Sequence, residues 1–314
     1  MIGQSVGLLA LALTATSPLS EADTHRQLAR ELAIRSGFSA TYELQCRKEG
    51  GLPAALFTPG APPATKLFDD FFYVGLNGVG AYVVRTTEGL ILIDALNSAA
   101  DAQSTIVPGM ESLGLNPGDL KYILISHGHG DHYGGAAWLA KTYGARVMAS
   151  EVDWAMMARS GGEARGRFDP PPVRDLVARD GQALKLGNTT IMITLTPGHT
   201  PGTLSFLIPV THNGVPHMLG MLGGTGIPAE AGARADYIRS LEKFAAIAAN
   251  AGADVELSNH PFVDDTIARI AQLRADPDGS NPFVIGRERY ADYSAIQMHC
   301  ARARDLEPAS APAR

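Results

Sequence analysis

The sequence predicts a layered α/β sandwich, in which helices cover stacked sheets. Three observations lead to this class. Short runs rich in β-branched and aromatic residues recur between Gly and Asn residues, as expected for strands with tight connections. Segments with a helical spacing of apolar residues alternate with these runs. The alternation occurs in two runs of similar length with no long linker and no short repeat, so we expect one main domain.

The first run follows an N-terminal region of different composition. We expect a short helix over residues 24–36 and irregular chain over residues 50–65, which are rich in Pro, Gly and Ala. Strands are then expected at residues 71–74, 81–84, 90–93, 122–125 and 146–148, and helices at residues 98–113 and 136–143. The strand at 122–125 is apolar throughout, which is typical of a strand buried on both faces.

The second run begins after residues 160–180, the least regular internal stretch, which contains three consecutive prolines. Strands are expected at residues 190–193, 204–208, 218–222 and 255–257, and helices at residues 235–249 and 266–274. The chain then divides into a leader over residues 1–22, an N-terminal extension over 23–66, the main domain over 67–305 and a disordered tail over 306–314.

The composition favours a globular protein that acts on small molecules. The 314 residues are 45% hydrophobic and 18% charged, and the formal net charge is −6 with an isoelectric point near 5.8. No basic run is present. Because nucleic acids and anionic membranes attract proteins through clustered positive charge, neither is an expected partner. The expected partner is a small-molecule substrate, and the oligomeric state is left open.

Residues 6–15 (VGLLALALTA) form an apolar run that is too short for the ~20 residues that a membrane-spanning helix needs. The small-x-small triplet Ser20-Glu21-Ala22 follows it. This combination is typical of a secretory signal peptide, although no Lys or Arg precedes the run. We expect a periplasmic or secreted protein, with a buried N-terminal helix as the alternative interpretation.

The chain has two cysteines, Cys46 and Cys300. Neither lies beside a His in a catalytic motif, and their spacing is not that of a metal site. In an oxidising compartment they could form one bridge between the two ends of the chain. The sequence leaves open whether they meet.

The segment His127-Gly128-His129-Gly130-Asp131-His132 directly follows the apolar strand at 122–125. It places four potential metal ligands within six residues. Imidazole and carboxylate suit zinc, which needs several ligands from different directions at ~2 Å. We expect Gly128 and Gly130 to permit the unusual backbone angles and the close approach of a sharp turn. His127 and His129 would then reach one metal, and Asp131 and His132 a second.

Four ligands cannot fill two zinc sites, so further histidines are needed at other strand ends. His199 lies in the tight loop Pro197-Gly198-His199-Thr200-Pro201 after a β-rich run, and His260 follows the strand at 255–257. The carboxyl ends of strands are where α/β sheets commonly carry their sites. The sequence therefore predicts six ligands from three loops.

Other candidates are less certain from the pattern. Asp94 ends the strand at 90–93, where its carboxylate could orient a metal ligand or, equally, cap the following helix. The remaining histidines lack a ligand context, and we expect most of them to face solvent, with His217 undetermined. They are His25, His212, His217 and His299.

The motifs HGHGDH and PGHTPG, followed by a His after a late strand, resemble the signature of the metallo-β-lactamase superfamily over about residues 67–260. The resemblance implies an αββα sandwich with two Zn²⁺ ions per chain. One would be held by His127, His129 and His199, and the other by Asp131, His132 and His260. The chain most resembles subclass B3, because no carboxylate or cysteine occurs at residues 221–226. Serines that often occur there in that subclass are absent, and Thr225 is the candidate for substrate binding.

The resemblance implies hydrolysis of the amide bond of β-lactams by a metal-bound hydroxide, which the catalytic Asp131 would orient. Residues 160–180 are the candidate for additional substrate contact. The alternative is a lactonase or a related small-molecule ester or amide hydrolase. A mononuclear-iron persulfide dioxygenase and a non-catalytic zinc protein are the remaining interpretations, and an unbroken set of six ligands counts against both.

Overall fold

The computed structural model describes residues 19–47, 53–159, 166 and 168–307. The apolar run at 6–15 and most of the expected tail therefore lie outside the described residues. Among the described helices, none combines the length and the apolar composition needed to cross a membrane.

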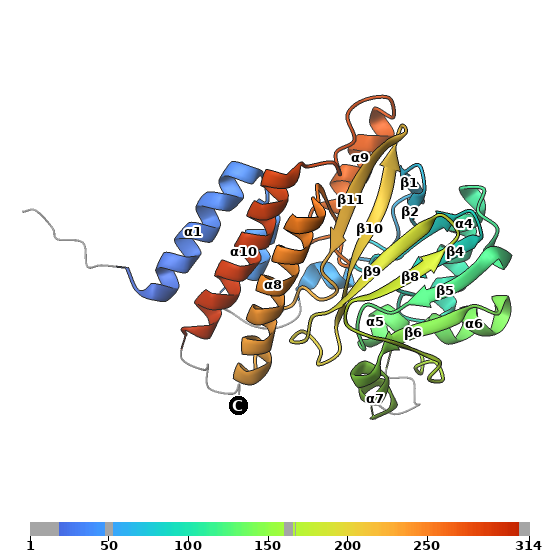
Figure 1. Ribbon diagram of the computed structural model, residues 1–314, viewed down its shortest axis with the longest axis horizontal. Coiled ribbons are helices and arrows are strands. Elements are labelled where there is room, and N and C mark those ends of the chain that lie inside the picture. The colour runs from blue at the N-terminus through green and yellow to red at the C-terminus, as the bar shows by residue number, and fades with distance from the viewer. Residues whose placement is uncertain (1–18, 48–52, 160–165, 167, 308–314) are drawn as a thin grey trace, which may run out of the picture.

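Two sheets form the centre of the structure (Figure 1). The first sheet has the order β1-β2-β3-β4-β5-β6-β7 in the described residues. Strands β1 to β4 pair antiparallel, whereas β4 to β7 pair parallel and are linked by helical crossovers. The strand bounds are β1 Thr65–Phe68, β2 Phe71–Tyr73, β3 Tyr82–Thr86, β4 Gly89–Ile93, β5 Leu120–Leu124, β6 Arg146–Ser150 and β7 Leu176–Ala178.

The second sheet has the order β12-β11-β10-β9-β8, and all its pairs are antiparallel except β11 with β12. A turn at Asn213 and Gly214, both with positive φ, closes the β10–β11 hairpin. The bounds are β8 Gln182–Leu186, β9 Thr189–Leu195, β10 Leu204–His212, β11 Val215–Met221 and β12 Val255–Glu256.

Helices cover the outer faces of both sheets. The first sheet is covered by short helices: α3 Ala99–Asp101, a π-helical turn Ala102–Ile106, α4 Val107–Ser112, α5 Gly130–Tyr133, α6 Ala136–Tyr143 and α7 Glu151–Arg159. The remaining helices are α1 Glu21–Ser36, α2 Ser39–Gln45, α8 Ala231–Ala251, α9 Thr266–Ala275 and α10 Arg287–Asp305. Helices α1, α10 and α8 lie side by side (Figure 1). Short 3-10 turns occupy Ala54–Phe57 and Pro117–Asp119.

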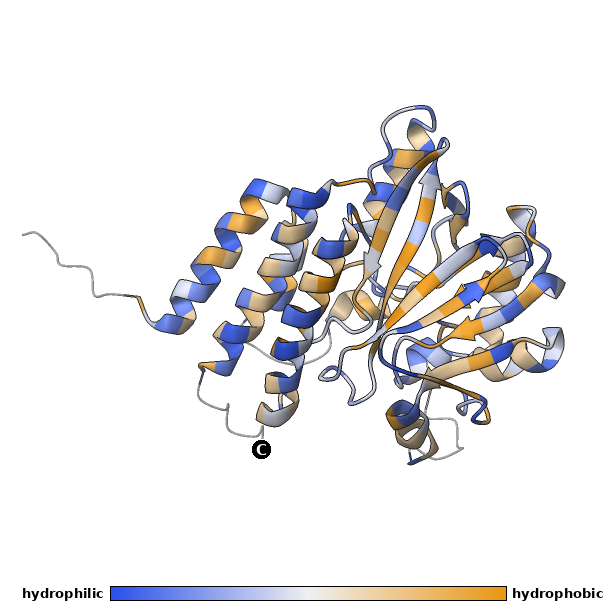
Figure 2. Cartoon of the chain, viewed as in Figure 1, coloured by the Kyte–Doolittle hydropathy of each residue, from blue (hydrophilic) through white to orange (hydrophobic). Residues whose placement is uncertain are grey.

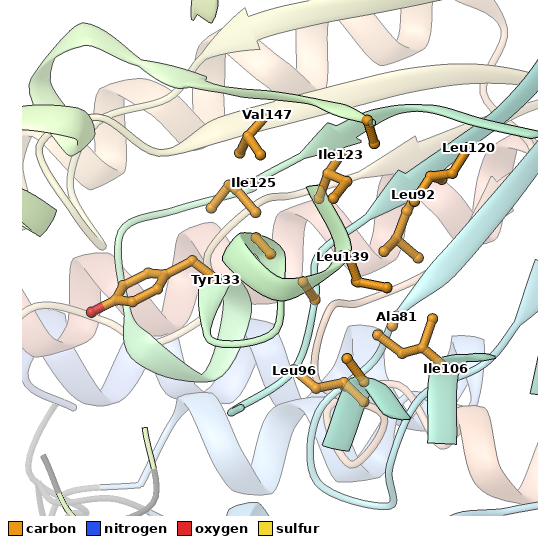
Figure 3. Close-up of a cluster of buried hydrophobic side chains, with 14 of the residues drawn as sticks. Ala81, Leu92, Leu96, Ile106, Leu120, Ile123, Ile125, Tyr133, Leu139 and Val147 are labelled. Atoms are coloured by element: carbon orange, nitrogen blue, oxygen red, sulfur yellow. The ribbon is translucent and has the colours of Figure 1, made fainter. Parts of the chain in front are cut away.

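The alternation of side chains along the strands builds separate apolar layers. In β4, Leu90 and Leu92 face the helices over the first sheet, whereas Ile91 and Ile93 face the second sheet. Leu92 lies near Leu139 of α6 in the outer cluster (Figure 3). Hydrophobic residues recur along the strands of both sheets, while α1, α8 and α10 alternate hydrophobic and hydrophilic positions (Figure 2). The αββα sandwich predicted from the sequence is confirmed.

Several expectations need correction. Residues 160–180 are not wholly irregular, because β7 closes the first sheet there. The helix expected at 98–113 is divided into α3, the π-helical turn and α4. Helix α10 was not predicted, since its buried face contains Asp292, Gln297 and Cys300 among apolar residues and shows weak apolar periodicity.

The expectation that most other histidines face solvent is wrong. All four are partly buried and have partners. His25 and His299 bring their Nδ1 atoms within 2.8 Å of each other between α1 and α10, and His217 Nδ1 lies 2.7 Å from Asp254 Oδ2. His212 Nδ1 lies 3.4 Å from Asn281 Nδ2.

A disulfide joins Cys46 to Cys300, which settles the question that the sequence left open. It connects the end of α2 to the C-terminal half of α10, and α10 also packs along α1. The two ends of the described chain thus form one helical layer on the second sheet, with a shared core that includes Phe38, Leu241 and Ile296.

Candidate metal centre

All six predicted ligands come together at one edge of the sandwich. They form two groups of three, and in each group the ligand atoms lie within 4.8 Å of one another. One group is His127, His129 and His199, and the other is Asp131, His132 and His260. This is the division that the resemblance implied.

The HGHGDH segment turns from the end of β5 into helix α5. Neither Gly128 nor Gly130 has a positive φ, so the expectation of unusual backbone angles is wrong. Close packing favours glycine at both positions instead, more strongly at Gly130 than at Gly128. A Cβ on Gly128 would lie 3.3 Å from the side chain of Asp153, and one on Gly130 would lie 2.6 Å from the Phe168 ring.

The loop that carries His199 needs glycine both for its backbone conformation and for close packing. Gly198 has a φ of 140°, a conformation that other residues rarely adopt, and a Cβ there would lie 2.5 Å from Tyr237. Across the site, a Cβ on Gly224 would lie 2.6 Å from the His199 side chain. The backbone of residues 223–226 therefore packs directly against the histidine ring.

Hydrogen bonds fix the orientation of four of the five imidazoles. In each ring Nδ1 donates to an acceptor, which leaves the lone pair of Nε2 for the centre of the site. The acceptors are Gly223 O for His127 at 2.7 Å, Gly226 O for His199 at 2.8 Å, Gly78 O for His260 at 2.9 Å and Asp94 Oδ2 for His132 at 2.7 Å.

The Nε2 atoms are arranged as metal donors. His127 Nε2 is buried and has no hydrogen-bond partner among the described residues. His132 Nε2 lies 3.3 Å from His260 Nε2 and 3.6 Å from Asp131 Oδ2. Buried polar atoms without partners are costly, whereas a cation between them would satisfy all of these lone pairs. The donor set, three imidazoles in one group and two imidazoles with a carboxylate in the other, fits zinc.

The electrostatics favour the neutral form of four of the five imidazoles, whereas Asp131 and Asp94 raise the pKa of the fifth, His132, against the effect of its burial. Burial, followed by the neighbouring imidazoles, lowers the pKa of His199 to about 3. Burial and then His132 lower the pKa of His260 to about 4. Burial alone would raise the pKa of Asp131, but His132 and His260 outweigh it and hold that pKa at about 2. Four neutral imidazoles and one carboxylate are thus available to a cation without first releasing protons.

Asp94 orients a ligand rather than capping a helix. Its Oδ2 accepts hydrogen bonds from His132 Nδ1 and from the Ser126 hydroxyl, and its Oδ1 accepts one from the Ser126 backbone N–H at 2.7 Å. The cap of α3 is supplied by Ser98. The capping alternative for Asp94 is therefore wrong.

Asp153, which sequence reasoning missed, ties two ligand loops together. It lies buried in the first turn of α7. It accepts the Gly128 N–H at 2.8 Å, the Thr200 hydroxyl at 2.7 Å and the Gly202 N–H at 2.9 Å. The only signal in the sequence is an acidic residue in the first turn of a helix, which is common without any such role.

Comparison with known proteins agrees with this geometry. The family model of the metallo-beta-lactamase superfamily matches residues 74–212, which contain five of the six ligands. The crystal structure of BJP-1, a subclass B3 metallo-beta-lactamase of Bradyrhizobium japonicum, has a TM-score of 0.65 and 29% identity, covering 75% of this chain and 90% of that chain. Native FEZ-1 metallo-beta-lactamase from Legionella gormanii shares the fold, with a TM-score of 0.66 at 22% identity over 78% of this chain and 95% of that chain. Residues 74–212 thus match the metallo-β-lactamase superfamily, and the structural similarity extends over most of the chain.

The matched superfamily is one of hydrolases, and the curated relatives of this chain have diverse names. An uncharacterized protein of Bacillus subtilis, YobT, is 35% identical over 43% of this chain and 59% of its own length. A hydroxyacylglutathione hydrolase of Acidiphilium cryptum is 32% identical over 34% of this chain and 37% of its own length. The N-acyl homoserine lactonase AttM of Azorhizobium caulinodans is 27% identical over 49% of this chain and 64% of its own length. The matches thus span less than two thirds of each of these relatives.

A cleft of about 300 Å³ opens beside the candidate metal ligands His199 and His260. Thr225, the predicted substrate-binding residue, lies in its lining but is only 3% exposed, and its carbonyl oxygen accepts a hydrogen bond from Gln45 Nε2. Of the expected contact segment 160–180, residues 160–165 and 167 lie outside the described residues. Its described members are absent from the cleft lining.

Proposed function

We propose that this chain is a zinc-dependent hydrolase that opens the amide bond of β-lactams. The observation that carries the proposal is the pair of adjacent three-ligand groups, with their Nε2 lone pairs and the Asp131 carboxylate turned inward. The proposal of two zinc ions rests on the same donors. The 29% identity to BJP-1 over most of both chains supports the lactamase assignment.

A second observation favours β-lactams over the thioesters of hydroxyacylglutathione hydrolases. The resemblance to the superfamily implies an additional bridging Asp between the last two histidine loops in glyoxalase-type relatives, whereas residues 223–226 of this chain contain no carboxylate. Side chains fit poorly there. A Cβ on Gly223 would lie 1.7 Å from Leu204 O, and one on Gly224 would meet His199. The packing supports a centre built without that ligand.

The position of each residue at the site suggests its role in the reaction. Zinc bound at such a site is a Lewis acid for a carbonyl and brings the pKa of a bound water close to neutral. Asp131, which is ionised above about pH 2, is an acceptor that can orient the attacking water. His199 and His260 line the cleft, so the scissile amide would enter on their side.

The test is turnover of nitrocefin and a carbapenem by the zinc-loaded mature protein, measured beside an acyl-homoserine lactone. Hydrolysis of both β-lactams is expected, and Asp131→Ala should reduce it by at least 100-fold. Rapid lactone opening without β-lactam turnover would overturn the assignment. Elemental analysis should give two zinc ions per chain, and a single iron would contradict the cofactor.

A lactonase is the second candidate, favoured by the similarity to AttM of Azorhizobium caulinodans. The same assay separates the two, because the lactone substrate has no amide in its ring.

We also propose that the protein is exported to the periplasm or secreted. The apolar run at 6–15 and the Cys46–Cys300 disulfide support this location, since disulfides persist in oxidising compartments. Mass spectrometry of the protein from the periplasmic fraction should find a chain cleaved near residue 22, and an intact N-terminus in the cytosol would contradict export.

A further inference from the structure

The cleft lining combines three kinds of chemistry. The imidazoles of His199 and His260 contribute one part of it. An apolar wall includes Leu44, Leu56, Ile227 and Phe262. The third part is a pair of guanidinium groups, Arg47 after α2 and Arg304 in the last turn of α10, which we call the arginine pair. Metal chemistry does not require the arginine pair, so it calls for a separate explanation.

The disulfide places the two arginines together. Arg47 directly follows Cys46, and Arg304 lies four residues after Cys300, on the same face of α10. Joining the two sulfurs therefore brings both arginines to the same wall of the cleft. A guanidinium N–H of Arg304 donates to the backbone carbonyl of Arg47. This contact fixes the Arg304 side chain, which reduces the entropy lost when it binds a ligand.

Other guanidinium groups lie close to the arginine pair. Burial lowers the pKa of Arg304, and Arg26, Arg47 and Arg234 lower it further, against the opposing effect of Glu307. Glu307 is shared, because its carboxylate pairs with Arg26 as well as lying 3.6 Å from Arg304 Nε. Arg26 also lies 3.4 Å from Asp23, and a cluster of guanidinium groups favours the approach of an anion.

Arg234 connects this charge to the cleft wall. Its Nη1 donates to the carbonyl of Ala229 at 2.8 Å and to that of Pro228 at 3.3 Å, and its Nε lies 2.9 Å from Asp305. Pro228 and Ala229 line the cleft. Arg234 thus holds this part of the cleft wall in place, and Arg47 and Arg304 are the guanidinium groups in the cleft lining.

We propose that Arg47 and Arg304 bind a carboxylate of the substrate while its scissile bond lies at the metal ligands, and that they select anionic substrates with an apolar body. The inference rests on the proposed hydrolase function and narrows its substrate class. Guanidinium groups bind carboxylates through paired, charge-assisted hydrogen bonds. Penicillins, cephalosporins and carbapenems carry such a carboxylate, whereas acyl-homoserine lactones are neutral. The arginine pair would therefore determine specificity without taking part in the chemical step.

The test compares one substrate in two charge states. Nitrocefin and its methyl ester share the same β-lactam, and only the free acid is an anion. In Arg304→Gln we expect kcat/KM for the acid to fall about tenfold, chiefly through KM, as for one lost charge-assisted hydrogen bond. The value for the ester should change less than twofold, which also shows that the variant is folded. Arg47→Gln should behave in the same way.

Arg302→Gln is the matched control. Arg302 lies on the same helix, but its guanidinium pairs with Glu242 and is absent from the cleft lining. Its substitution should leave the acid-to-ester ratio unchanged. An equal loss for acid and ester in Arg304→Gln, or no loss for either, would overturn the proposal.

A binding measurement separates this inference from the proposed function. Titration calorimetry of the zinc-loaded protein with 4-phenylbutyrate and with its neutral amide requires no turnover. We expect the acid to bind more tightly than the amide, and Arg304→Gln to weaken the acid about tenfold. Equal affinity of acid and amide, absence of binding by the acid, or an unchanged affinity in the variant would each refute carboxylate binding by the arginine pair. Loss of β-lactam turnover alone would refute only the proposed reaction.

Discussion

Replacing Asp153 by alanine tests whether one buried carboxylate holds two ligand loops in register. The substitution removes the acceptor for the Gly128 N–H, the Gly202 N–H and the Thr200 hydroxyl, which lie 2.7–2.9 Å away. Each hydrogen bond to a charged group is worth ~1.5–3 kcal/mol. The gross loss is partly offset, because burial raises the pKa of Asp153 and so makes the ionised carboxylate itself costly. We expect a net loss of about 3–5 kcal/mol in the free energy of unfolding.

The assay is urea unfolding of the metal-free and zinc-loaded proteins, together with zinc affinity measured by competition with a chelator. Asp153→Ala should unfold at lower urea and bind zinc more weakly, although Asp153 is not a ligand. Asp175→Ala is the control, since its carboxylate pairs with the exposed Arg146 and should matter far less. A loss below ~1 kcal/mol with unchanged zinc affinity would refute the role assigned to Asp153.

Three further predictions concern the centre and the helical layer. Asp94→Ala should weaken zinc binding about 10- to 100-fold, because His132 loses the acceptor that orients its ring, and unchanged affinity in the competition assay would contradict this. The metal-free protein should lose stability as pH falls below about 6.5, where unfolded histidines gain protons. Burial keeps the folded pKa values of His199 and His260 at about 3 and about 4, and only His132 is shifted upward among the five site histidines. Equal urea midpoints at pH 7 and pH 5 would count against those shifts. The Cys46→Ser, Cys300→Ser double variant should lose about 2–4 kcal/mol of unfolding free energy, because the bridge closes a loop with a separation of 254 residues. Calorimetric melting with unchanged stability would exclude that contribution.

The ligand residues could be predicted from the sequence because their signal is local. Four of the six ligands occur within the HGHGDH segment, and His199 lies between Pro and Gly residues that mark a tight loop. The strands before these loops were recognisable because short apolar runs rich in β-branched residues favour the β conformation. The layered sandwich followed from the same periodicity.

Other features depend on contacts between residues far apart in the chain, and no local pattern reveals them. Asp153 reaches Gly202 across 49 residues, and Cys46 meets Cys300 across 254. The sequence left open whether Asp94 orients a metal ligand or caps a helix, and the fold decided this by placing its carboxylate 2.7 Å from His132. Helix α10 lacked a clear apolar stripe because it packs between α1 and α8 with polar residues on its buried face. Local residue order thus determined the ligands, whereas the packing of layers decided what orients them and which charges line the cleft.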